Sequence, residues 1–266
     1  MAATTDVCII GAGLAGLACA GELAGAGVDT TVVEATDRVG GRVATDAIDG
    51  FLVDRGFQIL LTAYPEAHRQ LDLDALDLCR FEPGALVFTG GRLHRVADPL
   101  RRPGALLDTL RSPIGTPLDK LRILRLVLSV RRGAAADLLG RPDRSTLEQL
   151  DAVGFSDTMI DRFFRPLFSG IQLDPHLEVS ARRFAIILRM LAVGDTAVPA
   201  KGMAEIPRQL ATALPEGAVR LRCPAEGLDG TSVRLATSET IQARAVVVAT
   251  DGPTAVSLLP ELDPVL

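Results

Sequence analysis

The stretch that decides the fold is Asp6-Val-Cys-Ile-Ile10-Gly11-Ala-Gly13-Leu-Ala-Gly16, followed by an Ala- and Leu-rich segment that runs to Gly25. The apolar run before Gly11 is typical of a buried strand, and the segment after Gly16 is typical of a helix. In a G-x-G-x-x-G pattern, the first glycine allows a tight turn, the second lets a pyrophosphate approach, and the third packs the helix closely on the strand. The phosphate charge would then lie at the helix N-terminus, where unpaired N–H groups favour an anion.

A second strand follows and ends on an acidic residue. Thr30-Thr-Val-Val33 is β-branched throughout, and Glu34 stands at its end. A carboxylate at this place accepts hydrogen bonds from ribose hydroxyls and repels a 2′-phosphate. The array therefore predicts a dinucleotide site rather than a plain strand, turn and helix. Up to Glu34 it fits NAD and FAD equally.

The next residues separate the two cofactors. Glu34-Ala35…Arg38-Val-Gly40-Gly41-Arg42 contains a second glycine-rich turn for which a simple nicotinamide domain has no use. This array resembles the extended FAD fingerprint of the superfamily that contains flavin-containing amine oxidases, protoporphyrinogen oxidases and phytoene desaturases. The glycines would let the backbone approach the cofactor, and Arg42 would offer a forked cation to the diphosphate. A surface turn with a solvated Arg42, or an NAD-dependent dehydrogenase, is the alternative.

The resemblance extends along most of the chain. In the family, a D-x-G segment after a short hairpin lies along the flavin, and Asp54-Arg-Gly56-Phe57-Gln58 matches it. The family segment whose residue after a proline pairs its backbone with adenine matches Pro224-Ala225, and Lys201 lies in a turn that resembles one near the flavin. The resemblance implies these cofactor-binding residues: Gly11, Gly13, Leu14, Ala15, Gly16, Glu34, Ala35, Arg38, Gly41, Arg42, Gly56, Phe57, Gln58, Ala225 and Thr250. No catalytic acid or base is identified.

The end of the chain is expected to complete the first sheet. Val246-Val-Val-Ala249 is a continuous apolar run, as in parallel strands buried on both faces. We therefore predict an α/β fold in which a Rossmann-like FAD-binding domain is formed by residues 1–60 and 216–266. A mixed α+β substrate region, residues 61–215, would be inserted between these two parts, with a hairpin over residues 85–96.

The composition is that of an ordinary globular chain, with 266 residues, of which 48% are hydrophobic and 23% charged. A net charge of −5 and the absence of Trp argue against nucleic acid as a partner. The four cysteines are far apart, so we predict no metal site. No apolar run reaches the ~18 residues of a membrane-spanning helix. The N-terminal run lacks a preceding basic region, so we expect a cytoplasmic protein.

The inserted region contains a strongly basic segment. Residues 101–132 hold eight Lys or Arg and two Asp, a local charge of +6. A helix is expected from about Leu118 to Arg132, and its apolar residues would lie on a face away from the basic ones: Leu121, Leu124, Val127 and Leu128. We favour a solvated basic face on a helix whose apolar stripe packs into the substrate region, because membrane-facing helices usually carry Trp or several Phe. Peripheral contact with an anionic membrane surface is the alternative.

Two further helices are predicted in the inserted region. One begins at Ser156 and carries Phe163, Phe164 and Phe168, which would be either core or the wall of an apolar pocket. The other runs from Ser180 to Val193. It would present to solvent its three arginines, Arg182, Arg183 and Arg189.

These features predict an FAD-dependent oxidoreductase that moves a hydride equivalent from a small apolar substrate, such as an isoprenoid, to flavin. A porphyrinogen or an amine remains open as the substrate. Family members continue beyond the strand at 246–250 into a substrate segment and a Gly-Asp motif that covers the cofactor, whereas this chain ends at Leu266. The alternative is therefore an FAD-binding half without activity of its own, which would need a complementary chain or C-terminal segment.

Overall fold

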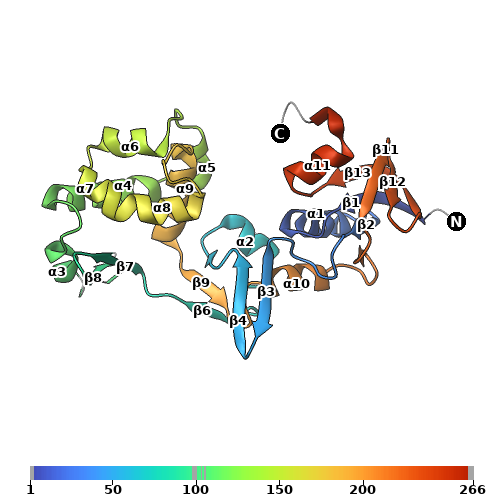
Figure 1. The fold of residues 1–266 in the computed structure, drawn as a ribbon, viewed down its shortest axis with the longest axis horizontal. Helices are drawn as coiled ribbons and strands as arrows, with labels where there is room; N and C mark the ends of the chain where they lie inside the picture. Colours follow the sequence, from blue (N-terminus) through green and yellow to red (C-terminus); the bar gives the residue numbers. More distant parts are fainter. Residues whose placement is uncertain (1–2, 98–100, 103, 105, 263–266) are drawn as a thin grey trace. The chain divides into compact units, whose positions relative to one another are not determined.

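The computed structural model describes residues 3–97, 101–102, 104 and 106–262, and the chain divides into two compact units. Unit 1 comprises residues 1–60, 65–79 and 198–266, and unit 2 comprises residues 61–64 and 80–197. The elements of unit 1 are β1 (Ala3–Ile10), α1 (Leu14–Gly25), β2 (Thr30–Val33), β3 (Val43–Ile48), β4 (Phe51–Gly56), α2 (Pro65–Gln70), α10 (Glu205–Thr212), β10 (Val219–Arg220), β11 (Ala225–Asp229), β12 (Ser232–Leu235), β13 (Thr240–Val248), α11 (Gly252–Leu258) and a 3-10 turn (Pro260–Leu262) (Figure 1).

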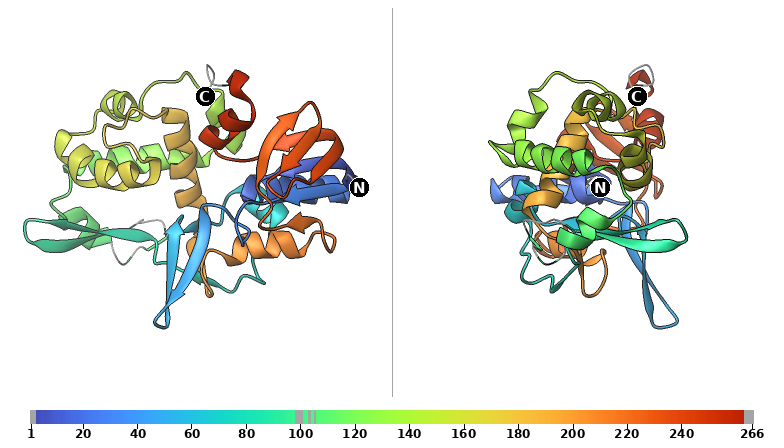
Figure 2. Two further views of the ribbon diagram at one scale, coloured as in Figure 1. Left: turned by 45° about the vertical axis from the view of Figure 1, so that its right-hand side comes forward. Right: turned by 90° about the vertical axis from the view of Figure 1, so that its left-hand side faces the viewer.

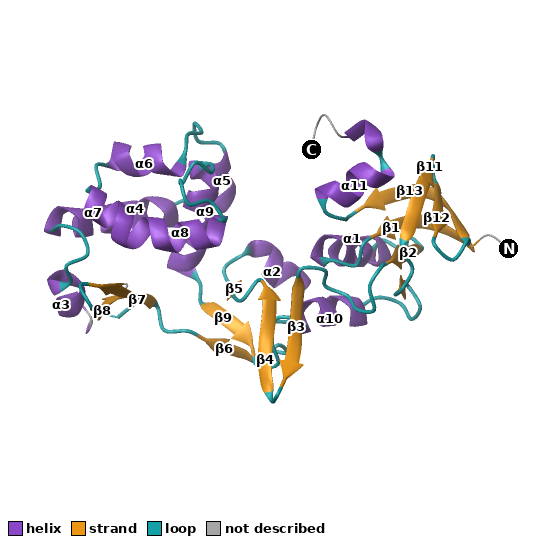
Figure 3. Cartoon of the chain, in the orientation of Figure 1, coloured by secondary structure: helices purple, strands orange, loops and turns teal. Residues whose placement is uncertain are grey.

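Unit 2 is mainly helical (Figure 3). Its elements are β7 (Gly84–Thr89), β8 (Arg92–Ala97), α3 (Leu106–Arg111), α4 (Pro117–Arg131), α5 (Ala135–Leu139), α6 (Thr146–Val153), α7 (Asp157–Met159), a π-helical segment (Ile160–Phe164), α8 (Arg165–Gln172) and α9 (Ala181–Val193). Three of the four points at which the chain passes from one unit to the other lie in short strands, β5 (Leu60–Leu61), β6 (Leu78–Arg80) and β9 (Thr196–Pro199), and the fourth lies between Tyr64 and Pro65.

The units differ from the expected domains at two segments, residues 65–79 and 198–215, which both belong to unit 1. Helix α10 accounts for the difference. Its Leu210 packs into the apolar cluster that also contains α1 and β2. The Gln209 side chain donates to the Asp72 carbonyl and accepts from the Asp72 N–H, each at 2.9 Å. These contacts tie both segments to the part of unit 1 that contains α1 and β2, although they are remote from it in sequence.

A six-stranded sheet of order β10-β2-β1-β13-β12-β11 forms the centre of unit 1. The first four strands of this order are parallel, and β12 and β11 continue antiparallel. Alternate residues of β1 point to opposite faces: Ile9 packs with Leu17 of α1, whereas Ile10 packs with Leu258 of α11. The predicted α/β fold is confirmed, as is the return of the last long strand to the first sheet.

The β3–β4 hairpin extends away from this sheet as a two-stranded arm, shown in blue in both views of Figure 2. A two-residue turn, Asp49-Gly50, connects the strands, and both residues have positive φ. The tip exposes three apolar side chains in succession, Phe51, Leu52 and Val53. The hairpin therefore combines a fixed register with an apolar surface.

Aromatic rings that pack at tilted angles form the core of unit 2. The ring centroids of Phe168 and Phe184 lie 4.5 Å apart, and those of Phe155 and Phe164 lie 4.8 Å apart. All four side chains are buried in one apolar cluster. The core interpretation of Phe164 and Phe168 is therefore confirmed. The helix expected from Ser156 is interrupted by one π-helical turn at residues 160–164. The hairpin predicted at residues 85–96 is present as β7 and β8.

A buried aspartate fixes the N-terminal end of α4. Asp119 is 0% exposed, and its carboxylate accepts hydrogen bonds from the N–H and hydroxyl groups of both Thr116 and Ser156. Burial alone would raise the pKa of Asp119, but the hydrogen bonds from Ser156 and Thr116 outweigh it and lower the pKa to about 2. The charged carboxylate therefore joins the start of α4 to the start of α7.

An arginine from α9 fixes the other end of α4. Arg189 donates from Nη1 to the carbonyl oxygens of Val130, at 2.5 Å, and Arg132. Cations at a helix C-terminus satisfy the last carbonyls and interact favourably with the helix dipole. Arg189 was expected in solvent, and this expectation is wrong because the unpaired carbonyls of α4 bind it. Arg182 likewise donates to the Arg141 carbonyl, whereas Arg183 is exposed as expected.

The Asp119 contacts generate a pH-dependent prediction. An unfolded aspartate titrates at about pH 3.9, so the lowered pKa of Asp119 stabilises the fold at neutral pH and this contribution disappears as the pH falls from about 4 to about 2. Asp119→Asn is expected to lower the free energy of unfolding at pH 7 by roughly 2–3 kcal/mol and to flatten this part of the pH profile. Urea unfolding at a series of pH values measures both effects.

Asp137→Asn is the matched control, because Asp137 accepts the Ala134 N–H at the start of α5 but is exposed. We expect it to cost less than about 1 kcal/mol. Equal losses in both variants would show that Asp119 contributes no more than an ordinary helix cap.

Candidate functional site

The turn between β1 and α1 has no room for side chains at two glycines. Gly11 has φ +106°, and a Cβ there would lie 2.9 Å from the carbonyl oxygen of Ala249. A Cβ on Gly16 would lie only 1.9 Å from the carbonyl oxygen of Gly11. The packing role expected for Gly16 is therefore confirmed, and the first turn of α1 lies directly on the strand that precedes it.

The N-terminus of α1 presents unsatisfied backbone N–H groups. Gly13 is its N-cap residue, and no side chain caps the helix, whose first turn contains no acidic residue. A Cβ on Gly13 would meet no atom within 4 Å, and the next two residues, Leu14 and Ala15, are exposed. Open space in front of free helical N–H groups is suited to an anion.

The second glycine turn packs against the first. Gly40 forms an isolated parallel bridge with Gly13, and its N–H donates to the Ala12 carbonyl at 2.8 Å. A Cβ on Gly41 would lie 3.6 Å from the Gly13 Cα. The two glycine motifs, which lie far apart in sequence, therefore form one surface around the start of α1.

Glu34 connects the end of β2 to the first turn. Its side chain is almost completely buried, at 8% exposure. One carboxylate oxygen accepts the Ala12 N–H at 2.8 Å, and the other accepts both the N–H and the hydroxyl of Thr36. Each carboxylate oxygen accepts about two hydrogen bonds, so the oxygen bound to Ala12 keeps capacity for a ribose hydroxyl.

Arg42 is the available cation of the site. Its side chain is exposed and forms no ion pair with any residue that the structure describes. It lies near Asp251: hydrogen bonds from Thr254 lower the pKa of that carboxyl, and the charge of Arg42 lowers it further. Thr250, the residue before Asp251, lies against Gly11. Arg42 is therefore at the same edge of the sheet as the first turn.

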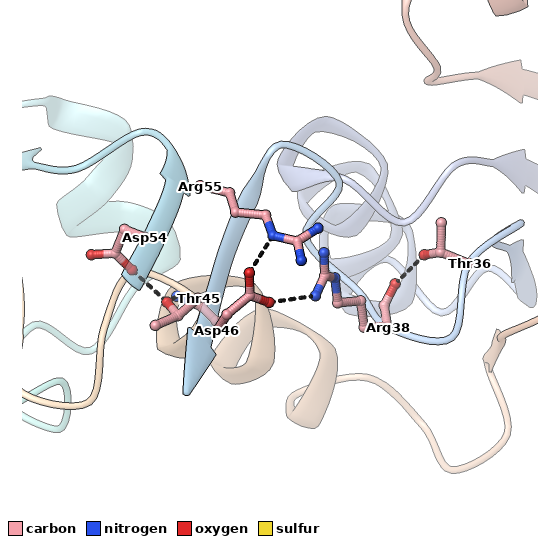
Figure 4. A network of polar contacts seen from close by, with 7 residues as sticks. Thr36, Arg38, Thr45, Asp46, Asp54 and Arg55 are labelled. Carbon is pink, nitrogen blue, oxygen red and sulfur yellow. Dashed lines mark hydrogen bonds and ion pairs between the residues drawn. The ribbon is translucent and has the colours of Figure 1, made fainter. Parts of the chain in front are cut away.

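Arg38, the other arginine of the motif, is already engaged. Asp46 on β3 accepts hydrogen bonds from Arg38, at 3.3 Å, and from Arg55 on β4 (Figure 4). The hydrogen bond from Arg55 is the main cause that lowers the pKa of Asp46 below its ordinary value. The Thr36 hydroxyl lies 2.9 Å from the Arg38 carbonyl oxygen and shares its single proton between that oxygen and Glu34. In the described structure, the Arg38 side chain therefore holds the hairpin to the loop after β2, where Ala35 is exposed.

A second polar pair fixes the hairpin to the start of α10, and the sequence analysis missed it. Thr45 donates to Asp54 across the hairpin (Figure 4). The same Asp54 oxygen accepts the Met203 N–H, and the Thr45 hydroxyl accepts the Ala204 N–H, each at 2.9 Å. The signal was available, because a two-residue turn at Asp49-Gly50 sets the register that places Thr45 opposite Asp54.

The remaining predicted residues lie at the edges of this surface. Gly56 pairs with Val43, and a Cβ there would lie 2.8 Å from the Arg42 carbonyl oxygen. Phe57, which is 56% exposed, and Gln58 follow it. Ala225 begins β11, two residues after Cys223, whose N–H donates to the Glu34 carbonyl. The cofactor roles of Phe57, Gln58 and Ala225, like those of the other predicted residues, stay predictions. Lys201 is exposed.

Comparison with known proteins identifies one family. Residues 14–265 match the family described as flavin containing amine oxidoreductase. A phytoene dehydrogenase from Streptomyces griseus is 29% identical over 243 residues, which cover 81% of this chain and 47% of that protein. An L-amino-acid oxidase from Bungarus fasciatus is 51% identical over 65 residues, which cover 24% of this chain and 12% of that protein.

The solved structures give the same fold. A double mutant of putrescine oxidase has a TM-score of 0.69 at 23% sequence identity, and the match covers 96% of this chain and 60% of that chain. At this identity the likeness concerns the fold alone. The chain spans about half the length of the phytoene dehydrogenase.

The contact between Gly16 and Gly11 generates the prediction for this site. Gly16→Ala is expected to destabilise unit 1 by roughly 3 kcal/mol, because the new Cβ must displace the Gly11 carbonyl. Gly21→Ala is the matched control in the same helix, where a Cβ meets no atom within 4 Å. It is expected to stabilise α1 by about 0.5–1 kcal/mol. Urea unfolding of both variants measures the difference, and equal stabilities would contradict the described packing of α1.

Proposed function

Because the chain belongs to the flavin containing amine oxidoreductase family, we propose that it forms the FAD-binding part of an oxidoreductase that removes a hydride equivalent from a small apolar substrate. The observation that carries this proposal is the uncapped N-terminus of α1, together with the Glu34 carboxylate bound to the turn before it and the exposed cation Arg42 after the second glycine turn. The family assignment agrees with the resemblance seen in the sequence. It also supports FAD as the cofactor.

The residues present fit a flavin dinucleotide. The space in front of Gly13 would accept the pyrophosphate, whose charge the free N–H groups of α1 and the Arg42 guanidinium would offset. The remaining capacity of the Glu34 carboxylate would bind the ribose diol. When bound, the flavin supplies the hydride acceptor, which no amino-acid side chain offers. The protein's own contribution is binding and orientation.

An apolar substrate is favoured by the surface beside this site. Phe57 and Ile59 are both exposed on the segment that follows β4. The Streptomyces griseus relative, whose match covers most of this chain, is a phytoene dehydrogenase. Both observations support an isoprenoid-like substrate over an amino acid or an amine. The described residues show no acid or base that we assign to catalysis.

The second candidate is an FAD-binding half that is inactive alone. The favouring observation is the apolar tip of the β3–β4 hairpin, where Phe51 is 73% exposed, together with the 47% coverage of the phytoene dehydrogenase. A complementary chain or a C-terminal segment would then provide the rest of the substrate site. Both candidates require FAD binding, and they differ in turnover.

FAD binding by the apoprotein tests the proposal. Calorimetric titration is expected to give one FAD site and no comparable NAD site, because Arg42 and the second glycine turn have no use in a simple nicotinamide domain. Arg42→Ala is expected to weaken FAD binding about ten- to a hundredfold, the usual cost of losing a charge-assisted hydrogen bond. Arg244→Ala is the control, since Arg244 is an exposed arginine of β13 that pairs with Asp6. The FAD affinity of this control variant should be unchanged.

The outcomes separate the candidates. Apoprotein that takes up no FAD, or that prefers NAD, would overturn the proposal. FAD-loaded protein is then mixed anaerobically with phytoene, an L-amino acid or putrescine, and bleaching of the flavin absorption is followed. Bleaching by phytoene alone is the expected result. FAD binding without bleaching by any of the three would favour the inactive half.

A further inference from the structure

Helix α4 carries an exposed stripe of leucines and arginines on the side opposite its packed face. The stripe consists of Leu118, Leu121, Arg125, Leu128 and Arg132, the last being the C-cap residue. The three leucines are 51%, 45% and 37% exposed. Successive members are three or four residues apart, so all five fall within an arc of about 80° on an ideal helix. Leucines at positions 121 and 128 were expected to face away from the basic residues, and this expectation is wrong.

The packed face of α4 is formed by other residues. Leu126 and Val130 are buried, and they belong to two apolar clusters of unit 2. Asp119 holds one end of the helix and Arg189 the other. Because both ends are fixed within unit 2, the stripe exists before any partner arrives. A preformed surface loses little conformational entropy on binding.

The charge that α4 presents outward is positive. Its single acidic residue, Asp119, is completely buried and accepts four hydrogen bonds inside unit 2. Arg125 and Arg132 are exposed on the stripe, and neither forms an ion pair with a residue that the structure describes. A partner of the stripe must therefore combine an apolar interior with negative charge.

We propose that this stripe docks on the surface of a lipid bilayer that contains anionic lipids. The leucines would enter the boundary between headgroups and acyl chains, while the two arginines bind lipid phosphates at the headgroup level. The helix lies on the membrane and does not cross it. No helix among the described residues is long and apolar enough to span a bilayer.

The same stripe is unsuited to a second copy of the chain. In an antiparallel pair of α4 helices, Arg125 near the middle of the stripe would face Arg125 of the other copy. In a parallel pair, each arginine would face its own counterpart. Like charges in direct opposition destabilise such pairs, whereas an anionic membrane neutralises both arginines.

Co-sedimentation of the full chain with vesicles tests the proposal. We expect stronger binding to phosphatidylcholine vesicles that contain phosphatidylglycerol than to phosphatidylcholine alone, with a loss at high salt. Arg125→Gln/Arg132→Gln should weaken binding to the anionic vesicles about 25-fold, at about fivefold per arginine. Leu121→Gln/Leu128→Gln should weaken it about tenfold, because less apolar area enters the bilayer.

The matched control is Arg208→Gln/Arg244→Gln, which removes the same charge from exposed sites in unit 1. It should change vesicle binding by less than about twofold. Circular dichroism establishes that every variant keeps its helix content. Binding that is absent, that is insensitive to the stripe variants, or that falls equally in the control would overturn the proposal. Leucine-dependent dimerisation without vesicle binding would also overturn it and would assign the stripe to a second copy. FAD titration of the stripe variants is an independent readout and should be unchanged.

Discussion

The absence of a side chain at Gly16 is the constraint on which unit 1 depends. The first turn of α1 lies so close to the Gly11 carbonyl that no other residue fits there. This contact fixes the path of the loop, so that the Ala12 N–H meets Glu34 and the Ala12 carbonyl accepts the Gly40 N–H. Two glycine turns and the acidic end of β2 are thereby joined. Packing within unit 1 alone therefore brings the uncapped start of α1 and the Glu34 carboxylate together.

Most of this arrangement could be predicted from the sequence because it is local. The alternation of apolar runs and glycines identified β1, α1 and β2, and the apolar run after residue 245 identified the end of β13. The buried face of helix α4 could not be predicted in this way. Leucines occur around much of its circumference, so the spacing alone did not decide which of them, Leu121 or Leu126, would be buried. Contacts with α9, remote in sequence, made that choice.

In the candidate site, too, local features could be predicted from the sequence and tertiary contacts could not. The glycines were predictable because their tight turns and close contacts demand glycine, and Glu34 was predictable because a carboxylate stands at the end of a β-branched strand. The different fates of Arg38 and Arg42 were not predictable from their shared motif. One is bound to Asp46 on the β3–β4 hairpin, and the other is left exposed beside the uncapped helix. Likewise, the pairing of Thr45 with Asp54 matters only because α10 returns to contact the hairpin. Side chains that act through tertiary contacts carry no local signature.

The pairing of β1 with β13 has a consequence for how the chain folds during synthesis. Ile10 lies opposite Val248, so one edge of β1 has no partner until residues 240–248 have left the ribosome. The aromatic core of unit 2 lies within one continuous segment, residues 80–197, and unit 2 contains only residues 61–64 besides. Its contacts therefore close shorter loops than the pairing of β1 with β13 does. Unit 2 therefore acquires its core first, while β1 and β2 wait with an open strand edge, the kind of surface on which nascent chains aggregate. The arrival of residues 240–248 thus determines when this open edge of β1 is covered.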